Sequence, residues 1–243
     1  MITLNKSDLK MALKKRASLK EDEAHVWLAS LIDHEKNIPY FRSLLSKDEL
    51  ERAGSFKFLK DQNYFIIGRG LLRCLLAEYL DRCPNDLEIV YGLWGKPCLS
   101  KEALLYFNLS HSGGYALYAF TRHYEVGIDL EYIDENLEIE NIALNAFSSD
   151  ELYCWKKLSL EDRLIGFFKL WACKEAYLKA LGKGWLGKEQ PIKFGSSIFC
   201  EEKQNVNYLT STPSYPCYFE CIPGYASAIF VNGPSLRLLR YTL

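Results

Sequence analysis

The chain has 243 residues, of which 49% are hydrophobic and 25% are charged, and its formal net charge at pH 7 is −1. This composition is ordinary for a globular protein, and the length allows one large or two small domains around a buried core. The near-zero charge excludes a strongly basic or acidic protein, so we expect no nucleic acid and no membrane as a partner.

The eight cysteines form no Cys-x-x-Cys pair and have no histidine at zinc-ligand spacing. The first 20 residues lack the apolar run of a secretory signal or membrane anchor, and no stretch reaches the ~18 apolar residues of a spanning helix. We therefore expect a cytoplasmic protein with reduced cysteines. The basic N-terminal segment is interpreted as a solvated helix face or a frayed end.

In chain order, the first expected strand is the apolar run at 24–32. Ser46 and Glu49 then stand in capping-box register, which predicts a helix beginning there. The longest apolar-periodic helix candidate is 60–81. The segment 91–100, rich in glycine and containing a proline, is expected to be a turn region.

Residues 103–122 are expected to form two apolar strands joined by a Ser-His-Ser-Gly-Gly connection, and a third strand covers 126–134. A helical stretch at 141–158 has Ser148 and Glu151 in capping-box register. A second strong helix covers 161–185 and is ended by Gly182 and Gly184. From about residue 191 the chain is expected to be strand-like.

Helix followed by strands thus occurs twice, on either side of about residue 123. The pattern predicts an α+β protein of two similarly sized halves, 1–123 and 124–243. Because no low-complexity linker separates them, we expect one compact body.

The strand VGIDLEYID, 126–134, raises the first functional question. Successive strand residues point to opposite faces, so Asp129 and Glu131 share one face and the apolar residues take the other. Two neighbouring carboxylates repel each other unless they face water, share a proton or hold a cation. A solvent-facing strand edge is the simplest interpretation, and a cation site is the alternative.

The helix at 161–185 carries a second group of charges. Lys174 falls inside its apolar arc, which is costly without a counter-charge and indicates an anionic ligand. Glu175 lies at the edge of the arc beside Trp171. Glu175 and Lys179 are four residues apart, so an exposed ion pair worth ~0.3–0.5 kcal/mol is the simpler interpretation for them.

The segment NLSHSGG, 108–114, places two hydroxyls, an imidazole and two glycines in one expected turn, which suits phosphate oxygens. A nucleophilic Ser-His pair is less well supported because no Gly-x-Ser-x-Gly frame is present. A simple hairpin turn with an exposed histidine also fits. WGKP, 94–97, is a turn with a lysine rather than a phosphate-binding loop.

Together, an acidic pair, a further glutamate and several isolated Lys, Arg and His residues fit a polyphosphate held by a hard divalent cation. Carboxylate and phosphate oxygens are the ligands that Mg²⁺ prefers. This combination favours phosphoryl-type transfer over redox or acyl chemistry.

The ordered motifs also carry a family resemblance; they are GKP, FNLSHS, GIDLE, FSSDE and WACKEAYLKALGKG. From about residue 45 to about 187 the chain resembles the 4'-phosphopantetheinyl transferases of the large, monomeric type that serve polyketide, nonribosomal peptide and fatty-acid synthases. The resemblance implies a pseudo-dimer of two α+β halves with the active site in the cleft between them. It also implies transfer of the phosphopantetheine arm of coenzyme A to a serine of an apo acyl or peptidyl carrier protein, with release of 3',5'-ADP.

Residue roles follow from the same resemblance. Asp129, Glu131 and Glu175 would hold Mg²⁺, or Mn²⁺ in its place, on the diphosphate. Lys179 would stabilise diphosphate charge, and Glu151 would be the general base, although capping a helix fits it equally well. The positions that match contacts to coenzyme A are Arg52, Lys96, Ser110, His111 and Lys174.

The chain departs from the family pattern where Tyr64 and Phe65 replace an arginine or another polar group. This leaves open how the 3'-phosphate of coenzyme A is held, and Arg69 and Arg73 either compensate or are surface charges. Two alternative functions are a Mg²⁺-dependent hydrolase of coenzyme A or a nucleotide diphosphate, and a non-catalytic coenzyme A binding module. Which carrier proteins are served is not encoded in any motif.

Overall fold

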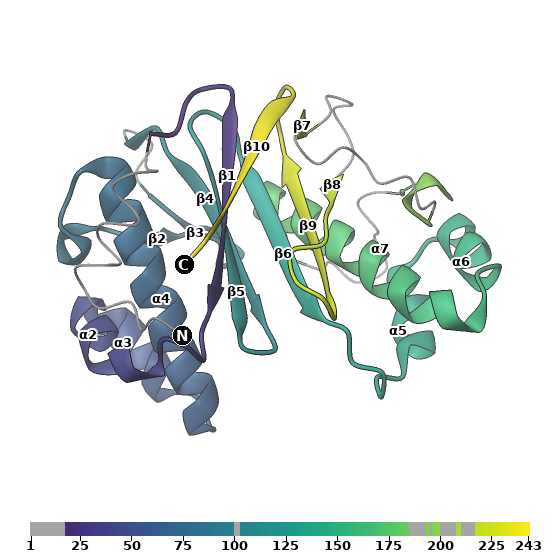
Figure 1. Cartoon of the computed structure of the whole chain (residues 1–243), viewed down its shortest axis with the longest axis horizontal. Coiled ribbons are helices and arrows are strands. Elements are labelled where there is room, and N and C mark those ends of the chain that lie inside the picture. The colour runs from purple at the N-terminus through teal and green to yellow at the C-terminus, as the bar shows by residue number, and fades with distance from the viewer. Residues whose placement is uncertain (1–17, 100–102, 185–192, 195, 200–207, 210–216) are drawn as a thin grey trace.

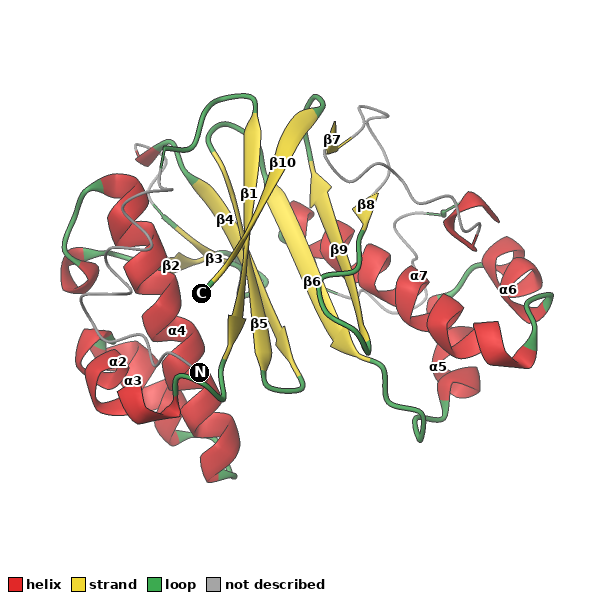
Figure 2. Cartoon of the chain, viewed as in Figure 1, coloured by secondary structure: helices red, strands yellow, loops and turns green. Residues whose placement is uncertain are grey.

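The structure, a computed structural model, describes residues 18–99, 103–184, 193–194, 196–199, 208–209 and 217–243. Strands occupy the centre, with one group of helices on each side (Figure 1 and Figure 2). The expected α+β class is therefore confirmed. Most of the basic N-terminal segment and part of the strand-like C-terminal region lie outside the described residues.

The α-helices are α2 (Ile38–Leu44), α3 (Lys47–Gly54), α4 (Leu59–Leu80), α5 (Ile139–Ala146), α6 (Ser149–Lys156) and α7 (Leu160–Leu181). Short 3₁₀ turns cover Glu35–Asn37, Pro84–Asp86 and Ser196–Phe199. The strands are β1 (Glu23–Ser30), β2 (Val90–Tyr91), β3 (Pro97–Cys98), β4 (Tyr106–Ser112), β5 (Tyr115–Thr121), β6 (Val126–Tyr132), β7 (Tyr208–Leu209), β8 (Cys217–Tyr218), β9 (Tyr225–Val231) and β10 (Leu236–Thr242).

The strands form two main sheets and one hairpin. The first sheet has the order β4-β5-β1-β10-β7, the second has the order β6-β9-β8, and β2 pairs with β3. The last strand, β10, runs parallel to β1 and so joins the sheet that contains the N-terminal strands. The division of the chain at residue 123 stays a prediction, because β10 crosses back over it.

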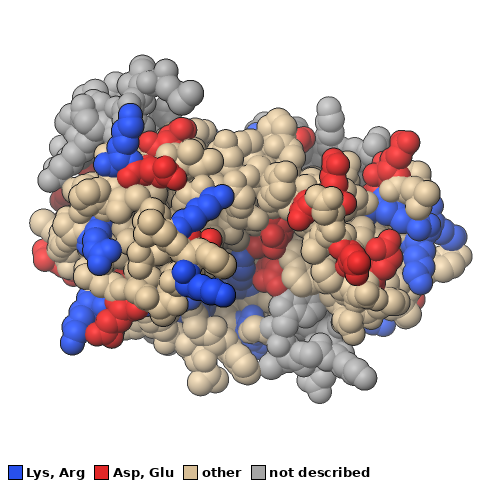
Figure 3. Space-filling model, turned by 90° about the horizontal axis from the view of Figure 1, so that it is seen from below, with Lys and Arg blue, Asp and Glu red and all other residues tan. Residues whose placement is uncertain are grey.

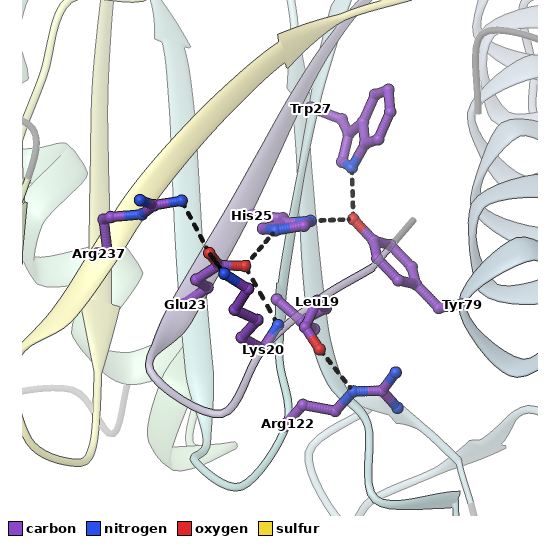
Figure 4. A network of polar contacts seen from close by, with 8 residues as sticks. All are labelled: Leu19, Lys20, Glu23, His25, Trp27, Tyr79, Arg122 and Arg237. Atoms are coloured by element: carbon purple, nitrogen blue, oxygen red, sulfur yellow. Dashed lines mark hydrogen bonds and ion pairs between the residues drawn. The ribbon is translucent and has the colours of Figure 1, made fainter. Parts of the chain in front are cut away.

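A buried polar network anchors β1 to its neighbours (Figure 4). His25 Nδ1 lies 2.7 Å from the hydroxyl of Tyr79 on α4, and Trp27 Nε1 donates to the same hydroxyl. Glu23 accepts from Arg237 Nη2 of β10 at 2.9 Å. Burial lowers the pKa of His25, so this network stabilises the fold with a neutral imidazole.

The two sheets pack face to face through an apolar core. Val126, Ile128 and Leu130 of β6 belong to it, together with buried residues of β1, β5, β9 and β10. The alternate face of β6 is turned to α7, which lies directly on it at Gly127. A Cβ at Gly127 would come within 1.9 Å of the Ala176 carbonyl oxygen, so only glycine permits this approach.

One local arrangement occurs twice. The eight-residue helices α3 and α6 each begin with the expected capping box, and each is followed by a 22-residue helix, α4 or α7. Both capping glutamates are buried and pair with a cation of the long helix: Glu49 with Arg73 at 2.7 Å, and Glu151 with Lys174 at 3.0 Å. Figure 1 shows one such helix group on each side of the strands.

Strand β4 meets β6 through side chains, because the two strands belong to different sheets. Asn108 Oδ1 accepts from the backbone N–H of Ile128 at 2.9 Å, and Ser112 Oγ accepts from that of Tyr132 at 3.0 Å. The expectation that Ser110 and its neighbours sit in a turn is wrong. They end β4, and the turn consists of the two glycines that follow, both at positive φ.

Within the described ranges, no helix combines the length and apolar character needed to cross a bilayer. The described cysteines at 74, 83, 98, 154, 173 and 221 take part in no disulfide.

Candidate active site

A charged cluster forms where β4, β6 and α7 meet. Lys179 Nζ of α7 lies 2.5 Å from Asp129 Oδ1 of β6 and donates to Ser110 Oγ of β4 at 2.9 Å. Ser110 Oγ in turn donates to the same carboxylate oxygen at 3.0 Å. Asp129 is 1% exposed, so the interpretation of this strand as a solvent-facing edge is wrong. The predicted exposed pair between Glu175 and Lys179 gives way to a pair with Asp129.

One oxygen of the Asp129 carboxylate can still bind a ligand. Its second oxygen, Oδ2, is buried and has no hydrogen-bond partner among the described residues. A buried carboxylate oxygen without a donor is costly, and a bound cation removes that cost.

Glu131 adds a second carboxylate on the same face of β6. Its Oε1 accepts from Trp171 Nε1 at 3.1 Å. Burial, and then the negative charges of Asp129 and Glu175, raise the pKa of Glu131 to about 7, although the Trp171 bond and the Lys179 charge act in the opposite direction. Glu131 therefore lies close enough to two further carboxylates, those of Asp129 and Glu175, to experience their negative charge.

The donor set fits the Mg²⁺ that the family resemblance implies. Asp129, Glu131 and Glu175 offer hard oxygens, which this ion prefers. In the described part of the chain no group of three or more His, Cys, Asp or Glu residues is already gathered at metal-binding distances. The Lys179 ammonium group neutralises Asp129 at Oδ1, and its side chain is 28% exposed, so it also has access to solvent.

Glu151 and Lys174, both predicted site residues, form a separate and enclosed pair. The Glu151 carboxylate is 0% exposed and the Lys174 side chain 3%. Glu151 Oε2 accepts from the backbone N–H of Ser148 at 2.7 Å, and Oε1 accepts from that of Phe194 at 2.7 Å. Lys174 thus finds the counter-charge that its buried position requires, and Glu151 caps α6 as expected. The general-base role of Glu151 and the coenzyme A contact of Lys174 stay predictions.

Positively charged side chains, among them Arg52 and Arg69, lie near His111 beside the acidic cluster. His111 of β4 is exposed at the surface. Its pKa is lowered first by desolvation from the protein around the ring, and then by the positive charges of Lys179, Arg69 and Arg52. The negative charge of Asp61 acts in the opposite direction. Figure 3 shows acidic atoms in the hollow between the two sides of the molecule, with basic atoms beside them on the side of α2–α4. A ligand with several negative groups would match this distribution.

Lys96, another predicted contact, lies at the loop between β2 and β3. Its Nζ donates to Glu125 Oε2 at 2.5 Å and to the Ala180 carbonyl near the end of α7 at 2.9 Å. It lines a cavity of about 320 Å³ bounded by the β2–β3 hairpin, β4 and the end of α7. Its position next to that cavity agrees with a ligand contact, which stays a prediction.

Comparison with known families gives two matches that together span both sides of the cluster. Residues 33–123 match the family described as 4'-phosphopantetheinyl transferase, N-terminal, and residues 125–229 match the 4'-phosphopantetheinyl transferase superfamily. The 4'-phosphopantetheinyl transferase HetI of Nostoc sp. is 39% identical over 170 residues, which are 69% of this chain and 72% of that protein. The chain belongs to the 4'-phosphopantetheinyl transferase superfamily.

Other members of the superfamily are similar over comparable lengths. The 4'-phosphopantetheinyl transferase Sfp of Bacillus subtilis is 28% identical over 80% of this chain and 85% of its own length. The human L-aminoadipate-semialdehyde dehydrogenase-phosphopantetheinyl transferase is 31% identical over 63% of this chain and 53% of its own length. The recognised family is thus confirmed.

Two contributors to the cluster were not predicted. Trp171 holds Glu131 through its indole N–H, and Asn108 holds β6 against β4. Trp171 lies in the same helix motif as Glu175, and Asn108 alternates with Ser110 along β4, so the sequence already carried a signal for both. Arg69 is buried, so its interpretation as a surface charge is wrong, and its alternative role in compensating for the missing polar group stays a prediction.

Proposed function

We propose that this protein transfers the 4'-phosphopantetheine arm of coenzyme A to a serine of an apo acyl or peptidyl carrier protein, with Mg²⁺, and releases 3',5'-ADP. The observation that carries the proposal is the Asp129–Lys179–Ser110 cluster with its unpartnered buried oxygen, in a chain of this superfamily. The names of the relatives, which are transferases of this group, support the same activity.

We also propose that the protein is a pseudo-dimer with its active site between the halves. Support comes from the repeated arrangement of a capped short helix, a long helix and a buried Glu–cation pair. Further support comes from the cluster, to which β4 contributes from one sheet and β6 from the other. The monomeric state and the cytoplasmic location stay predictions.

In the reaction, the serine oxygen forms a bond to the phosphorus of the arm, the bond from phosphorus to the departing 3',5'-ADP oxygen breaks, and the serine proton leaves. Asp129, Glu131 and Glu175 would hold Mg²⁺, which when bound neutralises diphosphate charge. Lys179 can turn from Asp129 to a diphosphate oxygen, where its charge favours departure of the nucleotide. Ser110 keeps Asp129 in place by its hydrogen bond.

The proton of the carrier serine requires an acceptor at the cleft. Glu151 can serve only if Lys174 moves away and the capping box loosens, because its two oxygens already hold Ser148, Phe194 and Lys174. We therefore assign Glu151 first to the stability of the α6 end. Chemistry at Glu151 would need an arrangement opened by the carrier protein.

The direct test is an intact-mass measurement on an apo acyl carrier protein incubated with the purified protein, coenzyme A and Mg²⁺. We expect a mass gain of one phosphopantetheine on the carrier, and none with EDTA or with a carrier whose acceptor serine is changed to alanine. Consumption of coenzyme A without mass gain on several carriers would show a hydrolase. Neither gain nor consumption would leave a coenzyme A binding protein.

A further inference from the structure

A chain of buried polar side chains connects β1 with α4, away from the candidate active site (Figure 4). Glu23, His25 and Trp27 alternate along β1, so all three lie on the same face of the strand. Their exposed fractions are 2%, 0% and 1%. The hydroxyl of Tyr79 on α4 contacts two of them, His25 and Trp27. None of these four residues has a part in the proposed reaction.

The hydrogen bonds indicate which nitrogen of His25 carries the proton. An indole N–H can only donate, so the Tyr79 hydroxyl oxygen accepts from Trp27 Nε1 at 2.8 Å. The hydroxyl proton is then available to His25 Nδ1, which lies 2.7 Å away and accepts it. The proton of the neutral ring therefore sits on Nε2, at 3.3 Å from Glu23 Oε2. In this arrangement each donor of the chain has an acceptor within the chain.

A second proton on the His25 ring would break the chain at Nδ1. That nitrogen would become a donor, and the Tyr79 hydroxyl proton would lose its acceptor. A buried hydroxyl group without an acceptor is costly. The charged form of His25 is thus incompatible with these hydrogen bonds as they stand.

The charges near His25 are mostly positive. Glu23 is the negative group, and it already accepts from Arg237 Nη2 of β10 at 2.9 Å and from the backbone N–H of Lys20 at 3.2 Å. The Lys20 ammonium group lies 3.9 Å from the same carboxylate. Arg122, which follows β5, is a further positive group that acts on the ring. A charged His25 would therefore share one carboxylate with three other cations.

These surroundings shift the titration of the ring. Burial lowers the pKa of His25 below its usual 6.5; Glu23 opposes this shift, and the charges of Arg122 and Arg237 add to it. The closed form is therefore most stable above about pH 6.5 and loses stability as pH falls below that value. Burial by itself would raise the pKa of Glu23, but its hydrogen bonds and positive neighbours lower it below 4.5. Glu23 thus weakens the chain only at more acid pH.

The His25 ring also lies against the last strand of the protein. Tyr241 of β10 meets the edge of the His25 ring, with 5.1 Å between ring centres, and its ring centre is 4.6 Å from that of Trp27. Arg237 holds the beginning of the same strand to Glu23. On its other edge, β10 pairs in the described part of the chain only with the two residues of β7. The polar chain therefore supports much of the attachment of β10.

We propose that His25 is a pH-sensitive switch, whose neutral ring holds β10 against β1 and α4 and whose protonation loosens β10. This inference goes beyond the proposed function and does not depend on it. Strand β10 belongs to the same sheet as β4, which carries Ser110. Loosening of β10 in mild acid would thus affect the sheet that contributes to the candidate active site.

Backbone amide exchange of β10, followed by mass spectrometry and corrected for the intrinsic effect of pH, measures this loosening. From pH 7.5 to pH 5.5 we expect the protection factor of residues 236–242 to fall by up to about tenfold, because one proton is linked to the opening and pH 5.5 lies about one unit below the pKa of an exposed histidine. Strand β9, residues 225–231, should keep its protection. Constant protection of β10 across this range would overturn the proposal.

A pair of histidine variants separates the switch from other titrations. In His25→Gln the side-chain amide can accept from Tyr79 and donate to Glu23 but does not titrate, so β10 should lose the pH dependence of its protection. His123→Gln removes a histidine that is 38% exposed and pairs with Glu21, and it should behave like the wild type. Comparison at equal pH cancels the groups that titrate in all three proteins. Equal pH dependence in wild type and His25→Gln would reject the proposal.

Nitrogen-15 NMR of the histidine rings tests the same inference on the wild-type protein, so it stays testable if His25→Gln fails to fold. At pH 7.5 the His25 spectrum should show a proton on Nε2 and none on Nδ1. Protonation of Nδ1 should occur over the same pH range in which β10 loses protection. A proton on Nδ1 at pH 7.5, or ring protonation without any change in β10, would contradict the proposal.

Discussion

Helix α7 supplies two lysines to two buried carboxylates, and the two pairs differ in how completely they are satisfied. In the pair of Glu151 and Lys174, both side chains are nearly or fully enclosed, and backbone N–H groups take both carboxylate oxygens. In the pair of Asp129 and Lys179, the lysine is 28% exposed, and one carboxylate oxygen has no hydrogen-bond partner in the described part of the chain.

The difference indicates that the Glu151–Lys174 pair stabilises the fold, whereas the Asp129–Lys179 pair can still bind a ligand. A satisfied buried pair holds elements together but has nothing left to offer a substrate. An unsatisfied one is costly in the free protein and is relieved by a bound group. The Glu49–Arg73 pair is the counterpart of Glu151–Lys174.

The largest expected effect on stability comes from breaking the enclosed pair. Glu151→Gln removes the carboxylate that pairs with the buried Lys174 and should lower the free energy of unfolding by about 3–5 kcal/mol. Chemical denaturation measures it. Adding Lys174→Met should recover most of the loss, because an apolar side chain of similar size needs no counter-charge.

The repaired double variant also separates the two roles of Glu151. Its carrier modification rate is measured well below its melting temperature and compared with that of Lys174→Met alone, because Lys174 is itself a predicted coenzyme A contact. A normal rate would assign Glu151 to the fold, and a rate near zero in a stable double variant, with the rate retained in Lys174→Met, would assign it to proton transfer. No recovery of stability in the double variant would contradict the assignment of the pair as structural.

Breaking the Asp129–Lys179 pair should reduce activity strongly and stability only slightly. Asp129→Asn keeps the shape but removes the charge, and we expect carrier modification to slow by about 10²–10³-fold. The free energy of unfolding should change by no more than about 1 kcal/mol, because Lys179 can reach water. A stability loss as large as that of Glu151→Gln would erase the distinction between the pairs.

The burial of Glu131, together with the negative charges of its neighbours, should make stability depend on pH in metal-free protein. The pKa of Glu131 is raised from 4.5 to about 7 in the folded state, so between these values the folded protein holds a proton that the unfolded chain has released. The Glu131 contribution is therefore most favourable below about pH 4.5, and stability is lost as pH rises toward and through about 7.

Denaturation in EDTA from pH 5 to pH 8 would measure this loss, which we expect to be roughly 2 kcal/mol after allowance for partial exposure. Glu131→Gln is the matched variant and should show a flatter profile. Mg²⁺ at pH 8 should restore the wild-type stability more than that of the variant. Identical profiles for the two proteins would mean that neither burial nor the neighbouring carboxylates raise the pKa of Glu131 in the folded protein.

The smallest effect concerns the hydroxyl that links the strands. Ser110→Ala removes one hydrogen bond to Asp129 and one from Lys179, and should cost about 1 kcal/mol of stability and less than tenfold in rate. Ser112→Ala removes the bond to the Tyr132 backbone in the same strand junction and is the control. It should match the stability loss without the loss in rate; equal rate losses would show that the junction, rather than the cluster, sets the activity.

Local patterns determined much of the architecture. The capping boxes at Ser46 and Ser148, the two long apolar-periodic helices and the alternation along β6 were all predictable, because each depends on residues within one or two turns of one another. The family and the candidate carboxylates also followed from short motifs. These features require no knowledge of what lies on the other side of a strand or helix.

Only the tertiary structure decided which charges are buried and which partners they have. Asp129 is buried against α7 and pairs with Lys179, and Lys174 pairs with Glu151. Arg69 is buried beside the ring of Phe65, and β10 pairs with β1 from the other end of the chain. The physical reason is that the energy of a charge depends on the solvent and counter-charges around it. Those surroundings are built by segments far apart in the sequence, so no local pattern contains them.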